Sequence, residues 1–160
     1  MNIIIRKIEE SDNLLLARII RKAFEEYGAP TQGTVYSDPT TDDLYHLFKA
    51  EKSVLWVALE DGIIAGCCGI YPTKGLPEKC VELVKFYLSA ESRKKGIGKA
   101  LLAKNLESAR LFGYTKLYLE SLPHFSDAIN LYEKQGFLRL NEPLGESGHN
   151  ACDVWMIKDL

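Results

Sequence analysis

The sequence has no long hydrophobic run and no strong net charge of either sign. No stretch approaches the roughly 20 apolar residues that a membrane-spanning helix needs, and the first residues, Met1 to Arg6, do not resemble a secretory signal. The formal net charge of the 160 residues is −2, so no global field draws the chain to nucleic acid or to an anionic membrane. These features predict a cytoplasmic protein without a nucleic-acid or membrane partner.

The cysteines and histidines lack the spacing of a metal site or a disulfide framework. Cys67, Cys68, Cys80 and Cys152 all fall in segments with a strand pattern or next to one, and none forms a Cys-x-x-Cys pair. The three histidines are scattered along the chain. We therefore expect buried thiols in a reducing compartment and no bound metal.

The hydrophobic pattern switches between the periods of strands and helices along the whole chain. Strands are expected at 3–8, 54–59, 63–71, 80–88, 116–121, 137–140 and 154–157, and helices at about 12–27, 42–51, 97–112 and 127–135. In the first helix, Leu15, Ile19, Ala23 and Phe24 are expected to face the core. Because no linker interrupts this order, the chain is expected to form one domain, residues 1–160, with an α/β fold and a mixed sheet.

The stretch from Cys80 to Leu102 carries the clearest functional signal. A strand leads through a short polar link into Arg93-Lys94-Lys95-Gly96-Ile97-Gly98-Lys99, which opens a helix. The first N–H groups of a helix have no partner within the helix and attract anions. Glycines let a ligand approach the backbone, and nearby cations add charge-assisted hydrogen bonds. The turn therefore predicts a site for the phosphate groups of a small molecule.

This turn departs from two better-known phosphate-binding motifs. A P-loop requires Ser or Thr after Gly-Lys, whereas Gly98-Lys99 is followed by Ala100. The dinucleotide-binding fingerprint requires a third glycine at the position of Leu101. Both departures argue against a generic nucleotide-binding domain.

The pattern Arg-x-x-Gly-x-Gly after a strand resembles the acyl-CoA pyrophosphate loop of the GNAT N-acetyltransferase superfamily. A second segment, Ala128 to Phe137, reads Ala-Ile-Asn-Leu-Tyr-Glu-Lys-Gln-Gly-Phe and is similar to the late helix of that superfamily. The order of strands and helices is also similar. The resemblance implies a single-domain GNAT-type acyl-CoA N-acyltransferase fold. In that fold a mixed, mostly antiparallel sheet splays apart at two central parallel strands and is flanked by helices.

The resemblance also implies an activity and a co-substrate, acetyl-CoA. In the superfamily, an amine attacks the thioester directly in a ternary complex, and acetyl-CoA lies where the two parallel strands diverge. The cofactor-binding residues that it implies here are Phe86, Tyr87, Leu88, Arg93, Lys94, Lys95, Gly96, Ile97, Gly98 and Lys99. Phe125 stands where several members carry a cofactor-contacting asparagine, so that contact is not carried over.

Three residues are candidate catalytic groups. Tyr132 falls where many members carry the acid that protonates the departing sulfur, and a phenol with a pKa near 10 can donate to a thiolate. An alkyl amine arrives as ammonium and needs a base. Glu82, among apolar neighbours, and Glu120, at the end of strand 116–121, are both candidates for that base. Either carboxylate could instead be a solvated or ion-paired strand residue, and an ordered water could act in its place.

The acceptor is expected to be a small-molecule amine rather than a protein, and a homodimer is left open. The resemblance places the acceptor site between the loop at 27–43 and the segment at 141–151. An acidic rim on these segments would suit a cationic amine. Its members would be Asp38, Asp42, Asp43, Glu142 and Glu146. The alternative function is a non-catalytic acyl-CoA-binding regulatory module on the same fold, which the presence of Tyr132 and two carboxylates disfavours.

Overall fold

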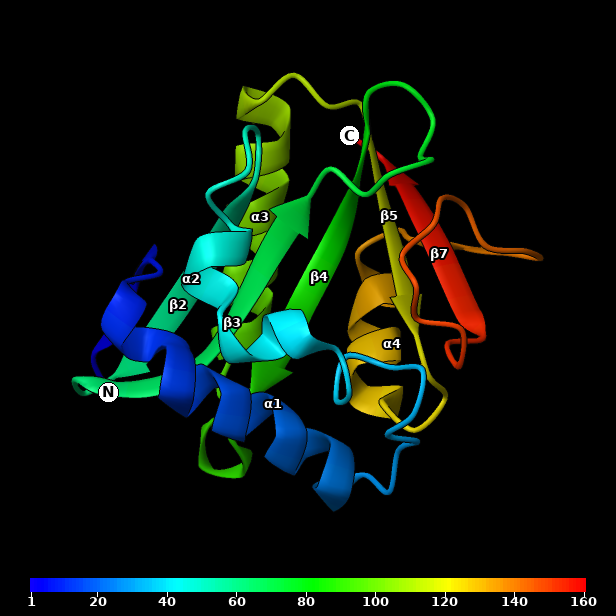
Figure 1. Cartoon of the computed structure of the whole chain (residues 1–160). Helices are drawn as coiled ribbons and strands as arrows, with labels where there is room; N and C mark the ends of the chain where they lie inside the picture. Colours follow the sequence, from blue (N-terminus) through cyan, green and yellow to red (C-terminus); the bar gives the residue numbers. More distant parts are fainter.

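The computed structural model describes residues 1–160, and a seven-stranded sheet forms its centre (Figure 1). The strands are β1 (Ile3–Lys7), β2 (Val54–Glu60), β3 (Ile63–Tyr71), β4 (Cys80–Leu88), β5 (Lys116–Ser121), β6 (Leu138–Leu140) and β7 (Val154–Asp159). They lie in the order β1-β2-β3-β4-β5-β7-β6, and only the central pair β4–β5 is parallel. The expected α/β fold with a mostly antiparallel mixed sheet is confirmed.

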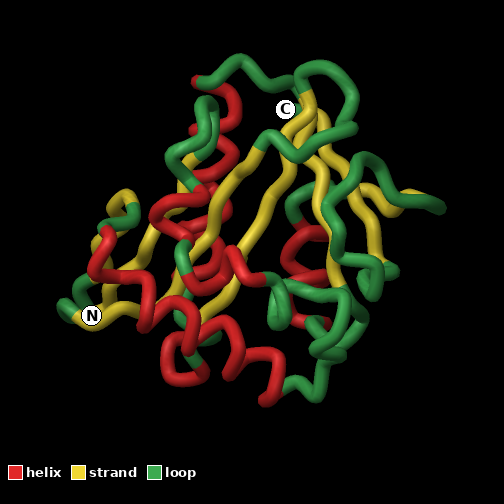
Figure 2. Tube along the Cα trace, viewed as in Figure 1, coloured by secondary structure: helices red, strands yellow, loops and turns green.

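Helices cover both faces of this sheet. The α-helices are α1 (Asn13–Glu26), α2 (Leu44–Leu47), α3 (Ile97–Leu111) and α4 (Ser126–Lys134), and 3₁₀ turns lie at Glu10–Asp12, Pro39–Asp42 and Ala90–Ser92. Figure 2 shows α1 and α2 in front of the strands and α3 behind them. No helix is both long enough and apolar enough to cross a membrane.

The sheet separates two apolar clusters. One lies under α3 and α4 and includes Leu101 and Leu102 of α3, which are almost completely buried against β2 to β5. The other lies under α1 and includes Leu16 and Phe24. Because burying a side chain of this size stabilises the fold by about 1.5–3 kcal/mol, these contacts hold the helices in place on the sheet.

The face of α1 that contacts the sheet differs from the one that we expected. Leu15 is 48% exposed and Ile19 is half-buried, so the prediction is wrong at these two positions. Asp12 sets the rotation of the helix, because its carboxylate turns inward and accepts hydrogen bonds of 2.8 and 3.0 Å from Arg6. The residues that the helix buries are Leu16, Ala17, Ile20, Ala23 and Phe24.

The second helix is much shorter than expected. The prediction of a helix over 42–51 is wrong because α2 spans only Leu44–Leu47. Asp43 begins it by accepting a hydrogen bond of 3.2 Å from the N–H of His46. The chain then turns toward β2, and the Ser53 hydroxyl donates to the carbonyl of Ala50 at 2.6 Å.

The two parallel strands diverge after their first halves. Pairing between β4 and β5 runs from Cys80 opposite Lys116 to Leu83 opposite Leu119 and then stops. Figure 1 shows the two strands separating beyond this point. The splay that the family resemblance implies is therefore present, and it leaves the backbone of the second half of β4 unpaired on the side of β5.

Candidate active site

A cleft of about 380 Å³ opens where β4 and β5 diverge. Its walls come from the end of β4, the turn before α3, the end of α1 and the first turns of α4. Eight of the ten predicted cofactor-binding residues line it. They are Phe86, Tyr87, Leu88, Arg93, Lys94, Gly96, Gly98 and Lys99.

The side chains of the other two predicted residues point elsewhere. Lys95 donates a hydrogen bond of 2.8 Å to Glu60 on β2, which neutralises its charge away from the cleft. Ile97 is 1% exposed and belongs to the apolar cluster under α3. These two residues can therefore contribute to the cleft through their backbone N–H groups and not through their side chains.

The turn before α3 presents free backbone donors to the cleft. Gly96 adopts a φ of +87° immediately before the helix, a conformation that glycine reaches without steric cost, and no side chain caps the first turn. The first N–H groups of α3 therefore lack partners within the chain. Gly98 faces the cleft, where an added Cβ would lie 3.5 Å from the side chains of Phe86 and Leu88.

Arg93 joins the turn to β4 and α1. Its guanidinium donates to the carbonyl of Leu88 at 2.9 Å and to Glu26 at 2.8 Å. It also lies over the ring of Tyr27, with its Cζ 4.9 Å from the ring centroid. Arg93 therefore fixes one wall of the cleft, while Lys94 and Lys99 line the same cleft without an ion pair to any carboxylate.

A second cavity of about 70 Å³ adjoins the cleft on the side of the paired halves of β4 and β5. The two share four lining residues, which are Phe86, Tyr87, Phe125 and Ala128. Glu82, Glu120 and Tyr132 all line the second cavity. The structure thus brings the three candidate catalytic residues together, although they come from β4, β5 and α4.

Glu82 is buried, with 4% of its surface exposed. Burial raises the pKa of its carboxyl to about 7, and the nearby charge of Glu120 adds to the effect. The hydroxyl of Thr73 donates to Glu82 at 2.5 Å, which partly offsets the increase. A carboxyl group with this pKa can take up and release a proton near neutral pH.

Both oxygens of Glu120 accept hydrogen bonds from neighbouring side chains. Tyr118 donates to Oε2 at 2.7 Å, and Ser147 donates to Oε1 at 2.5 Å. The Tyr118 hydroxyl in turn accepts a hydrogen bond of 3.0 Å from the N–H of Leu144. Glu120 therefore anchors the segment before β7 on the sheet.

Tyr132 is buried between two aromatic rings. Its ring centroid lies 6.1 Å from that of Phe86 and 5.6 Å from that of Phe137. Burial raises the pKa of the phenol, so it stays protonated at neutral pH. Its hydroxyl makes no hydrogen bond within the chain, which leaves a proton donor in the wall of the second cavity.

Two loops close the second cavity on the side of α1. The Ala151 N–H donates to the carbonyl of Gly33 at 3.1 Å. His149 Nε2 lies 2.8 Å from Asp38 Oδ2. Asp42 is paired with Arg21 at 2.5 Å. Asp38 and Asp42 are therefore engaged within the chain and do not contribute free charge to an acidic rim, whereas Glu142 is exposed.

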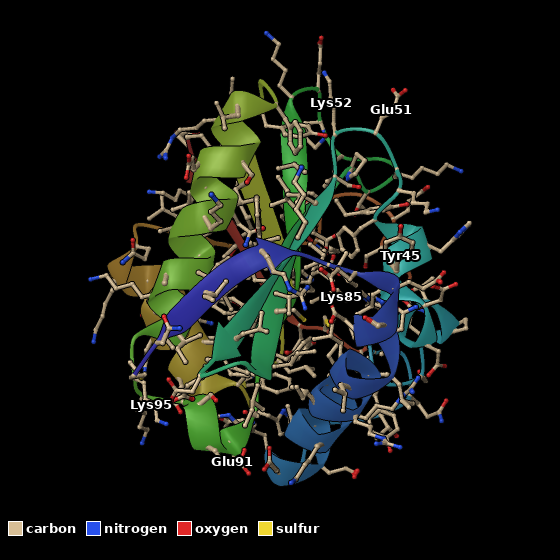
Figure 3. All side chains as sticks on the ribbon, turned by 90° about the vertical axis from the view of Figure 1, so that its left-hand side faces the viewer. Tyr45, Glu51, Lys52, Lys85, Glu91 and Lys95 are labelled. Atoms are coloured by element: carbon tan, nitrogen blue, oxygen red, sulfur yellow. The ribbon has the colours of Figure 1, made fainter.

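Sequence reasoning missed two residues that line this cavity, Lys85 and His149. Asp38, which was expected at the rim of the acceptor site, lies beside both of them. Figure 3 shows Lys85 in the interior, whereas Glu51, Lys52, Glu91 and Lys95 lie at the periphery. A lysine within an otherwise apolar strand was the available signal for Lys85. Nothing in the sequence pairs Asp38 with His149, which are 111 positions apart.

Comparison with known proteins identifies the family. The model of the acetyltransferase (GNAT) family matches residues 15–137. The uncharacterized N-acetyltransferase YjgM of Escherichia coli strain K12 is 35% identical over 158 residues, which cover 98% of this chain and 95% of that protein. The probable N-acetyltransferase family 8 member 5 of Mus musculus is 34% identical over 146 residues, which cover 90% of this chain and 60% of that protein.

Solved structures share the fold at lower sequence identity. A GNAT-family acetyltransferase from Staphylococcus aureus Mu50 superposes with a TM-score of 0.88, at 20% identity over 99% of each chain. The PaiA N-acetyltransferase of Thermoplasma acidophilum, solved in complex with coenzyme A, superposes with a TM-score of 0.76, at 20% identity over all of both chains. Together with the sequence relatives, these matches show that this chain belongs to the GNAT family of acetyltransferases.

Proposed function

We propose that the protein transfers the acetyl group of acetyl-CoA to the primary amine of a small molecule, by direct attack in a ternary complex. The observation that carries this proposal is that the two cavities adjoin and share four lining residues. The cleft offers free N–H groups and cations for a pyrophosphate, and the adjoining cavity is lined by a buried carboxyl and a buried phenol. Such an arrangement suits a long polyanionic thioester whose reactive end must be kept away from water.

The unpaired edge of β4 provides a place for the pantetheine arm. Beyond Leu83, the backbone of β4 has no partner on β5. Buried N–H and C=O groups need hydrogen-bond partners, and the two amides of pantetheine can supply them as an added strand. The pyrophosphate would then lie at the start of α3, near Lys94 and Lys99, and the thioester would lie beside Tyr132.

Glu82 and Tyr132 fit the roles of base and acid. Glu82 accepts a proton from the attacking amine, whose nitrogen forms a bond to the acetyl carbon. The carbon–sulfur bond breaks, and Tyr132 donates its proton to the departing sulfur. Glu82 is a better base than Glu120, because its pKa lies near 7, whereas both oxygens of Glu120 are already engaged by Tyr118 and Ser147.

The size of the second cavity supports a small acceptor. Its volume is about 70 Å³, and contacts between the loops at 31–43 and 141–151 cover it. An extended peptide would need an open groove at this position. A compact amine fits without displacing either loop.

Turnover of acetyl-CoA in the presence of a panel of amines tests the proposal. We expect release of free CoA thiol that depends on the amine, with an N-acetylated product in the mass spectrum. Tight CoA binding without turnover of any amine would instead support an acyl-CoA-binding regulatory module. Acetylation of a protein substrate but of no small amine would overturn the acceptor class.

Substitution of Gly98 by valine is expected to weaken CoA binding by at least tenfold, which corresponds to about 1.4 kcal/mol. Gly98 lines the cleft, and a Cβ at this position would already be in van der Waals contact with Phe86 and Leu88, so the two methyl groups of valine would extend into the space proposed for the pyrophosphate. Titration calorimetry measures the change. Gly113→Asn is the control. A Cβ at position 113 would meet nothing within 4 Å, and asparagine is the residue that most readily replaces glycine at the φ of +88° found there. Equal CoA affinity of the wild type and a folded Gly98→Val variant would contradict this placement.

None of the four cysteines is expected to carry the acetyl group. Burial raises the pKa of Cys67 and Cys152 to about 12 and of Cys80 to about 11, and it also raises the pKa of Cys68. Their thiols therefore stay protonated and are poor nucleophiles. Mass spectrometry of the protein after incubation with acetyl-CoA alone should show no acetylated cysteine. Stoichiometric labelling of any of them would argue against direct transfer.

A further inference from the structure

We propose that the acceptor carries a carboxylate beside its amine, and that Lys85 binds this carboxylate. The inference rests on the proposed function, because it concerns the acceptor of the same reaction. It names the substrate class as small amino acids and closely similar amino carboxylates. The observation behind it is a buried ammonium group that faces the second cavity and makes no hydrogen bond.

A β-bulge places Lys85 on this face of the sheet. Cys67 pairs with Tyr87 and Gly69 pairs with Val84, so that two residues of β4 lie opposite one residue of β3. Lys85 takes a φ of +56° at the bulge. In a strand whose side chains alternate regularly between the two faces, Lys85 would share a face with Leu83 and would point toward α3. The bulge instead turns it toward the loops that cover the second cavity.

The ammonium group of Lys85 lacks an adequate partner within the chain. Only 4% of its side chain is exposed, and its nearest carboxylate is Asp38, at 3.8 Å, which is beyond hydrogen-bond distance. Asp38 is already engaged, since Oδ2 lies 2.8 Å from His149, and Oδ1 accepts from the N–H and the hydroxyl of Thr40 at 2.9 and 2.7 Å. Lys85 Nζ therefore makes no hydrogen bond within the chain, and it retains enough exposure to the cavity to meet a ligand.

Buried polar groups in folded proteins are almost always hydrogen-bonded, and a buried charge is paired. A carboxylate on a ligand would supply both the hydrogen bonds and the opposite charge. Such charge-assisted hydrogen bonds are stronger than neutral ones. The cavity has room for a compact anion such as a carboxylate.

A carboxyl group, which can carry the opposite charge, lies close by on the same strand. Glu82 lies three positions before Lys85 and lines the same cavity. Both side chains therefore reach the same space of about 70 Å³. A ligand that places its amine at Glu82 and its anion at Lys85 must hold these groups only a few atoms apart. The α-amino acids have this spacing.

Acceptor amines that differ only in their carboxylate group test the inference. The common L-α-amino acids, their carboxamides and the corresponding decarboxylated amines would be assayed with acetyl-CoA by thiol release. We expect at least one amino acid to exceed its carboxamide in kcat/KM by about tenfold or more. In Lys85→Met, the ratio of the two kcat/KM values should fall to about one, because methionine cannot pair with the carboxylate and any change common to both acceptors cancels in the ratio. A wild-type preference for carboxamides or decarboxylated amines would overturn the inference, as would equal preferences in wild type and Lys85→Met.

A binding measurement separates this inference from the proposed function. N-acetylglycine would be titrated calorimetrically into the CoA-loaded wild type, Lys85→Met and Lys85→Gln, with thermal midpoints recorded to exclude unfolded protein. We expect binding to the wild type and at least tenfold weaker binding to both variants. If no amine is turned over but this pattern holds, the proposed function fails while the anion subsite stands. Equal affinity in all three proteins, or no binding to any of them, would show that Lys85 does not bind a carboxylate and would overturn the inference.

Discussion

Replacing Glu82 with glutamine is expected to lower kcat/KM by about 10²- to 10⁴-fold, the range typical of a lost general base. The amide keeps the size of the side chain and can still accept the hydrogen bond from Thr73, but it cannot take a proton from the amine. Steady-state kinetics with varied amine at saturating acetyl-CoA would measure the change. Glu107→Gln is a matched control on the exposed surface of α3, where 61% of the side chain is accessible, and it should leave the rate unchanged.

The pH dependence provides a second readout of Glu82. Burial raises its pKa from 4.5 to about 7. Since only the carboxylate acts as a base, the wild-type kcat/KM should increase with pH and level off above about 7. This acidic limb should be absent from Glu82→Gln. An unchanged profile in that variant would assign the limb to another group.

Stability measurements exclude a trivial loss of activity in Glu82→Gln. A carboxyl whose pKa is raised on folding binds more protons in the native state than in the unfolded state. Wild-type stability should therefore decrease as the pH rises from about 4.5 to about 7 because of this group. The glutamine variant lacks this contribution, so its thermal midpoint at pH 8 should equal or exceed that of the wild type. An inactive variant that is also less stable at pH 8 would weaken the assignment.

Replacing Tyr132 with phenylalanine is expected to lower kcat by roughly 10²-fold. The substitution keeps the ring between Phe86 and Phe137 and removes only the hydroxyl. The affinity for acetyl-CoA should change little, because the hydroxyl acts mainly when charge develops on the sulfur. Any limb of the pH profile at high pH that reports the phenol should also disappear.

A purely structural role for Tyr132 gives a different result. The hydroxyl makes no hydrogen bond within the chain, so its removal leaves no buried partner unsatisfied. In that case kcat would stay within about threefold of the wild-type value, and only the thermal midpoint would change. Recording kcat and the thermal midpoint on the same preparation of Tyr132→Phe distinguishes the two roles.

Much of the fold could be predicted because the strands have clear patterns. The turn at Asp61-Gly62 joins two β-branched segments, and both residues adopt positive φ in the structure. The rotation of α1 could not be predicted in the same way. Leu14, Leu15 and Leu16 are all apolar, so periodicity allows more than one buried face, and an ion pair of Asp12 with β1 decides between them.

Residues of the candidate site could be proposed from the sequence where they lie in one segment or match a family motif, and they were missed where they depend on a contact across the fold. The turn from Arg93 to Lys99 is contiguous, so its glycines and cations are visible in the sequence. Lys85 reaches the cavity only through a bulge, which period-two alternation does not include. The interaction between Asp38 and His149 depends on the packing of two loops.

A structure of the protein with bound acetyl-CoA would test the central claim most directly. We predict that the pyrophosphate lies at the start of α3, that the pantetheine pairs with the unpaired half of β4, and that the thioester sulfur lies within about 3.5 Å of the Tyr132 hydroxyl. The acetyl group would then point toward the cavity lined by Glu82. Acetyl-CoA bound elsewhere, or with its thioester directed away from Tyr132 and Glu82, would contradict the account.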